Sequence, residues 1–89
     1  MREVVIDGNE INSRCQLHEK LSEGLKFPEW YGRNLDALHD LLTEAGEEVV
    51  ITVKDFPALE ENLGRYAHLL RKVISDAAEE NQKIKIEII

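Results

Sequence analysis

The sequence lacks the features of disulfide-linked, zinc-binding and membrane proteins, namely paired cysteines, Cys and His at zinc-binding spacing, and long apolar runs. Cys15 is its single cysteine, so no internal disulfide can form, and no Cys and His spacing suits a structural zinc. No apolar run approaches the roughly 18 residues of a membrane span. No basic segment followed by an apolar one opens the chain. We therefore expect a cytoplasmic protein with no cofactor and no membrane contact, which packing alone stabilises.

Basic residues are also scarce. Eleven lysines and arginines stand against 18 aspartates and glutamates, which gives a formal net charge of -7. Nucleic acids and anionic lipids are unsuitable partners for such a chain, because both need cations that neutralise phosphates. The segment 29–48 contains one basic residue, Arg33, and six carboxylates, namely Glu29, Asp36, Asp40, Glu44, Glu47 and Glu48. A local excess of one charge steers encounters, so we expect a basic protein partner.

The chain of 89 residues is long enough for one core, so we expect a single domain over residues 1–89. Three apolar runs predict strands, at residues 3–6, 49–53 and 84–89. Capping residues and apolar spacing predict helices in four other segments, at residues 12–24, 34–45, 55–61 and 65–80. Their order predicts an α/β fold, a three-stranded parallel sheet packed against about four helices. The V-V-I-T-V run at 49–53 is nearly continuous, which predicts a central strand covered on both faces.

The first predicted helix carries two residues of types that often do chemistry, Cys15 and His18. We expect an ordinary structural role for each. Cys15 should behave as a small, partly buried apolar side chain, and His18 as a group held by hydrogen bonds.

The stretch from Phe27 to Thr43 is the most informative part of the chain. Its first half is a loop that places Trp30 and Tyr31 between a proline and Gly32. Asn34 then follows, and asparagine is a preferred N-cap because its side-chain oxygen accepts a bond from a free N–H of the first turn. The loop therefore leads directly into a helix.

The predicted helix after Asn34 has an apolar and an acidic side. Its leucines face the core, whereas Asp36, Asp40 and Thr43 face solvent, with His39 at the border. Like charges four residues apart cost a helix about 0.2 to 0.5 kcal/mol. A sequence that carries this cost favours a functional use of the two aspartates.

Aromatic side chains beside aligned carboxylates are typical of a protein-binding surface. One alternative is a regulatory binding module with an unrelated cationic partner. Another is a metal-dependent or acid/base enzyme, since Asp36, His39 and Asp40 have the spacing that converges on one side of a helix. The enzyme has less support, because the sequence shows neither a nucleophile beside a base nor a glycine-rich phosphate loop.

The segment P-E-W-Y-G-R-N-L-D-A-L-H-D-L-L-T at residues 28–43 resembles the signature of the barstar family, the intracellular inhibitors of the ribonuclease barnase. The resemblance extends over nearly the whole chain and implies a barstar-like fold without enzyme activity. It implies that a free monomer binds one basic, secreted, barnase-type ribonuclease in a 1:1 complex. The second helix and its preceding loop would fill the active site, with carboxylates in place of RNA phosphates. The partner-binding residues so implied are Trp30, Tyr31, Gly32, Asn34, Asp36, His39, Asp40, Thr43 and Asp76.

Overall fold

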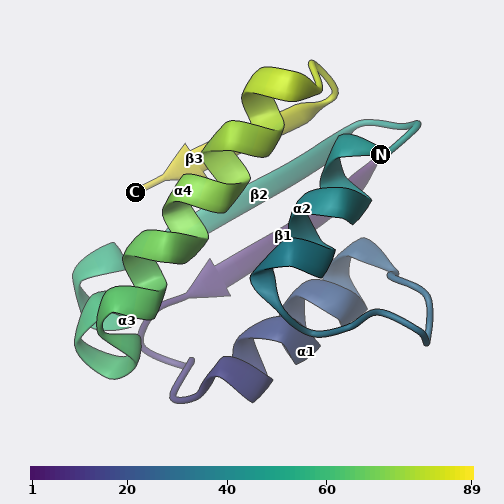
Figure 1. Ribbon diagram of the computed structural model, residues 1–89. Coiled ribbons are helices and arrows are strands. Elements are labelled where there is room, and N and C mark those ends of the chain that lie inside the picture. Colours follow the sequence, from purple (N-terminus) through teal and green to yellow (C-terminus); the bar gives the residue numbers. More distant parts are fainter.

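Three parallel strands form one sheet, and the second strand of the sequence lies in the middle of it. The computed structural model describes residues 1–89. The sheet runs in the order β1 (Arg2–Asp7), β2 (Val49–Lys54) and β3 (Ile84–Ile88), as Figure 1 shows. Both neighbouring pairs are parallel. The predicted α/β fold with a three-stranded parallel sheet is confirmed.

Four helices connect the strands, as predicted. The helices α1 (Arg14–Leu25) and α2 (Leu35–Thr43) lie between β1 and β2 in the chain. The helices α3 (Phe56–Leu63) and α4 (Arg65–Glu80) lie between β2 and β3. In Figure 1, α2 and α4 pass in front of the sheet beside each other, and α1 lies along β1. No helix combines the length and the apolar composition that a membrane crossing requires.

The expectation that β2 is covered on both faces is wrong. Val49, Ile51 and Val53 are buried, but Val50 and Thr52 between them are only partly so. Both crossovers step in the same direction across the sheet, and crossovers of one hand that do so place their helices on the same face. The other face stays open. β-branched residues suit a pleated strand on either face, so their presence could not reveal this.

The core lies between the covered face of the sheet and the helices, and it contains 18 buried apolar residues. The helix α2 contributes Leu38 and Leu42, which are fully buried, while Leu35 and Leu41 are partly buried at its flanks. The predicted apolar side of this helix is therefore confirmed. The opposite side of α2 is not part of the core.

The two residues singled out on the first helix have different outcomes. His18 is buried and hydrogen-bonded, which confirms its structural role. Cys15 is exposed, so the expectation of a partly buried side chain is wrong. It lies in the first turn of α1, on the side that faces away from Leu17 and Leu21.

Candidate functional site

The loop of residues 26–34 leads into α2, and Asn34 at the end of the loop caps the first turn of the helix. Asn34 has extended backbone angles, and its Oδ1 accepts a bond of 2.8 Å from the N–H of Ala37. Its Nδ2 donates to the carbonyl of Gly32 at 3.2 Å. The sharp turn occurs at Arg33, whose φ of 54° lies in the left-handed region. Gly32, directly before it, has no positive φ.

The end of α2 is held by a residue from another part of the chain. The side-chain amide of Asn81 donates to the carbonyls of Leu42 at 3.0 Å, Ala45 at 3.1 Å and Thr43 at 3.4 Å. The last carbonyls of a helix have no partner within the helix, and this amide supplies a donor to those of Thr43 and Ala45 and a further donor to that of Leu42. Asn81 directly follows α4 and thereby joins the ends of the two helices. The sequence showed it only as the end of the fourth helix.

The outward side of α2 carries carboxylates without counterions. Asp36 and Asp40 are exposed, and neither takes part in an ion pair. Of the six carboxylates in the segment 29–48, only that of Glu47 forms an ion pair, and its partner is Arg2. Thr43 lies one turn beyond Asp40 and donates from its Oγ1 to the Asp40 carbonyl at 3.1 Å. We call Asp36, Asp40 and Thr43 the acidic side of α2.

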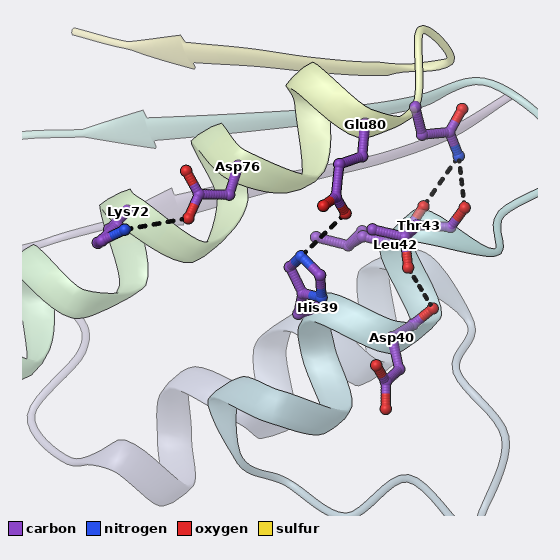
Figure 2. Close-up of polar contacts among 8 residues, drawn as sticks. His39, Asp40, Leu42, Thr43, Lys72, Asp76 and Glu80 are labelled. Atoms are coloured by element: carbon purple, nitrogen blue, oxygen red, sulfur yellow. Dashed lines mark hydrogen bonds and ion pairs between the residues drawn. The ribbon is translucent and has the colours of Figure 1, made fainter.

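His39 and Asp76 lie apart from this acidic side. Figure 2 shows His39 reaching from α2 toward α4, while Asp40 points elsewhere. The Nε2 of His39 is 3.1 Å from a carboxylate oxygen of Glu80. Asp76, on α4, is 3.3 Å from the Nζ of Lys72. The structure therefore joins Asp36, Asp40 and Thr43 on one side of α2, turns His39 toward α4, and places Asp76 on α4 beside Lys72.

The two adjacent loop aromatics have opposite environments. Trp30 is 74% exposed, whereas Tyr31 is 5% exposed. The Tyr31 hydroxyl lies 2.6 Å from Nδ1 of His18, and its ring packs against Phe27 with centroids 4.8 Å apart. Tyr31 was expected to contact a partner, and its burial leaves little of its side chain at the surface for such a contact. Trp30 is the aromatic residue that the loop presents to solvent.

Tyr31 belongs to a buried polar network that anchors the loop. The two ring nitrogens of His18 bond to the hydroxyls of Tyr31 and, at 2.7 Å, Tyr66 on α4. Burial lowers the pKa of His18, and the positive charge of Arg33 lowers it further. Burial likewise raises the pKa of Tyr31 and that of Tyr66. All three groups are therefore neutral near pH 7, and a neutral imidazole has one donor and one acceptor to serve both tyrosines.

The side chains that an enzyme or metal site would use are not assembled. No three His, Cys, Asp or Glu side chains come together in a way that could hold a metal ion. Asp36, His39 and Asp40 share a helix, but His39 is turned to Glu80. The geometry gives the metal-dependent alternative no support.

Comparison with known proteins adds to this geometry. The chain matches the model of the family described as Barstar (barnase inhibitor) over residues 1–89, which include every strand and helix. It is also 41% identical, over 81 residues, to the Bacillus subtilis (strain 168) protein named "Putative ribonuclease inhibitor YrdF". That alignment covers 90% of this chain and 89% of the relative.

Proposed function

The chain belongs to the barstar family of barnase inhibitors, and we propose that it inhibits a basic ribonuclease of the barnase type. Membership of this family supports an inhibitor rather than an enzyme. The observation that carries the mechanism is the acidic side of α2, where Asp36 and Asp40 are exposed and without counterions. In this proposal α2 and the loop before it occupy the nuclease's active site.

The chemistry of a ribonuclease active site makes such a contact favourable. A site that binds the phosphates of RNA presents arginine and lysine, and a carboxylate forms charge-assisted hydrogen bonds with the same groups. Asp40 takes the central phosphate position, and Asp36 stands one helical turn away. The inhibitor thereby replaces the substrate's anions with its own.

The capping of α2 at both ends supports this proposal. Asn34 caps its start and Asn81 holds its end, so the backbone that carries the two aspartates is already in place before the partner arrives. A preorganised surface loses less conformational entropy on binding than a flexible one. Trp30 adds a large apolar contact beside the charges.

The remaining proposed contacts surround this centre. Gly32 and Thr43 flank the acidic residues along the chain, His39 is turned toward α4, and Asp76 lies on α4 itself. We propose a 1:1 complex between a free monomer in the cytoplasm and a nuclease that is otherwise secreted. Such an inhibitor protects the RNA of the cell that makes the enzyme.

The test is a ribonuclease assay. Cleavage of RNA by several basic, barnase-type ribonucleases is measured with rising amounts of the purified protein, and we expect inhibition that is complete near equimolar amounts. A variant with Asp36→Asn and Asp40→Asn serves as the matched control, because it keeps the shape and removes the charges. Unchanged cleavage at micromolar excess across the whole panel contradicts the proposal and favours an unrelated cationic partner.

A further inference from the structure

A hollow of about 560 Å³ opens at the end of α2, where Leu41 and Leu42 line it. It lies between the loop before α2 and the residues 44–47 after it. Its walls are mainly apolar and include Phe27, Trp30, Leu41 and Ala45. Nothing lies within 4 Å of where a Cβ on Gly46 would stand, which agrees with the open space at this wall. The size is typical of sites that enclose a side chain or a small ligand.

Trp30 is the most exposed of the large apolar residues that line this hollow. Its side chain is 74% exposed although an apolar surface lies beside it. Exposed tryptophans next to apolar pockets are frequent centres of binding energy in protein interfaces. The helix that carries Asp40 also contributes Leu41 and Leu42 to the wall of the hollow.

The rim of the hollow is negatively charged. Glu44 and Glu47 both line it, and Glu44 has no ion pair. Arg2 is the one basic residue in the lining, and it is already engaged. It pairs with Glu47 and donates to the carbonyl of Leu25 at 3.0 Å. An occupant therefore meets apolar walls and a carboxylate that lacks a counterion.

We propose that this hollow is a second docking site for the basic partner and takes an apolar side chain that is flanked in the partner by lysine or arginine. The identity of the partner as a ribonuclease rests on the proposed function. The negative rim argues for a cationic protein, since a second copy of this chain would bring the same carboxylates against each other.

A peptide titration tests the hollow without any nuclease. The isotope-labelled protein is titrated with N-acetyl-Lys-Leu-Arg-amide and followed by NMR, with Lys-Ser-Arg and Gln-Leu-Gln peptides as matched controls. We expect the first peptide to shift the methyl signals of Leu41 and Ala45 and the indole signal of Trp30. Each control should bind at least about tenfold more weakly, the loss that corresponds to about 1.4 kcal/mol. Equal binding of a control, or no shifts at millimolar peptide, overturns the proposal.

Two variants locate the binding. Ala45→Phe places a ring in the hollow and should abolish the shifts, and Trp30→Ala removes an exposed wall and should weaken peptide binding about tenfold. Val5→Ala is the control, because Val5 is 39% exposed on the open face of the sheet. Since Trp30 is mostly exposed, its variant keeps the test valid even if Ala45→Phe does not fold. Unchanged binding by Trp30→Ala overturns the assignment.

A nuclease arm separates this inference from the proposed function. If the parent protein inhibits a ribonuclease, Trp30→Ala and Ala45→Phe should each weaken that inhibition about tenfold or more, and Val5→Ala should not. Full inhibition by both folded variants overturns the second site together with the Trp30 contact, and leaves intact the proposed inhibition through the acidic side of α2. If the parent inhibits no ribonuclease, the proposed function fails and the peptide titration alone decides the chemistry of the hollow.

Discussion

Asp40 is a side chain that the fold does not use. Its carboxylate is exposed and has no ion pair, whereas its backbone carbonyl accepts bonds from the Thr43 hydroxyl and the N–H of Glu44. A like charge at Asp36 lies one turn away and repels it. Function rather than stability is therefore the better explanation for an aspartate here.

Asp40→Ala should separate binding from folding. Alanine is the better helix former and relieves the repulsion by Asp36, so the free energy of unfolding should stay unchanged or rise by a few tenths of a kcal/mol, roughly 0.2 to 0.5. Binding to an inhibited ribonuclease should lose about 2 to 5 kcal/mol, a range for which the barnase–barstar complex is itself a reference case. This is a roughly 30-fold or larger loss of affinity. Calorimetry and urea unfolding measure the two quantities.

Glu87→Ala is the matched control for this variant. Glu87 is an exposed carboxylate of β3 and lies opposite Thr52 on the open face of the sheet. Its removal should change neither affinity nor stability. If Asp40→Ala binds as tightly as the parent, or unfolds much more easily, the acidic side of α2 is not the inhibitory surface.

His18 should make the stability of the fold depend on pH. Burial lowers its pKa below the ordinary value of 6.5, and Arg33 adds to this effect. The unfolded chain therefore binds a proton at a pH where the folded chain does not. The stabilisation is complete above about pH 6.5 and is lost as the pH falls below that value. The slope from one such group is at most about 1.4 kcal/mol per pH unit.

The variant His18→Gln isolates this contribution. Glutamine is neutral at every pH in the range and offers both a donor and an acceptor near Tyr31 and Tyr66. Urea unfolding of both proteins between about pH 7.5 and 5 measures the free energy of unfolding. The parent should lose stability more steeply on acidification than the variant. Parallel curves would show that His18 takes up its proton equally well in the folded and unfolded chains.

At the scale of the element, α2 is fixed at its two ends by two asparagines of different origin. Asn34 belongs to the chain just before the helix, and Asn81 comes from the end of α4. The first bond sets where the helix begins. The second sets how α2 lies against α4, and so where its acidic side is presented.

Asn81→Ala should loosen the end of α2. The substitution removes the side-chain donor to the carbonyls of Thr43 and Ala45 and one of the donors to that of Leu42, and a buried polar group left unsatisfied costs about 1 to 3 kcal/mol. We expect a loss of this size in urea unfolding and faster hydrogen exchange at the amides of Glu44 and Ala45. Gln82→Ala, at the exposed neighbouring position, should have neither effect. Equal exchange in both variants would mean that water replaces the Asn81 amide at no cost.

The difference between the two asparagines explains what the sequence could predict. The cap at Asn34 acts three residues away, so a local pattern reveals it, and the leucine spacing reveals the buried side of α2. The contacts of Asn81 span 36 to 39 residues and leave no local pattern. Trp30 and Tyr31 lie in a loop without periodicity. Only the structure therefore shows that Tyr31 is buried and hydrogen-bonded to His18.

At the scale of the molecule, topology is the feature that the sequence predicts best. Three apolar runs with helices between them leave few arrangements, because parallel strands need long crossovers of one hand. The open face of the sheet was missed, because burial on one face depends on the direction in which each crossover steps. Topology also places the segment 29–48 along α2 and the loops at its ends, so its charge acts from one region of the surface.

That concentration of charge should govern how fast a basic partner arrives. The chain carries a formal net charge of -7, and five carboxylates of the segment 29–48 have no ion pair. At about 0.1 M salt, charges more than about 10 Å apart are largely screened. The association rate with an inhibited ribonuclease should therefore fall steeply with added salt. The dissociation rate should change much less, since the contacts within the complex are close and shielded from salt.

The location of the charge, rather than its sum, can be tested with two double variants in stopped-flow experiments. Glu29→Gln with Glu44→Gln removes two charges beside α2, and Glu3→Gln with Glu87→Gln removes two from the open face of the sheet. Both proteins then have the same net charge. If the field near α2 steers the partner, the first variant should associate several-fold more slowly at low salt and the second should stay close to the parent. Equal slowing by both would mean that net charge alone attracts the partner, and a rate that salt does not change would mean that no steering occurs.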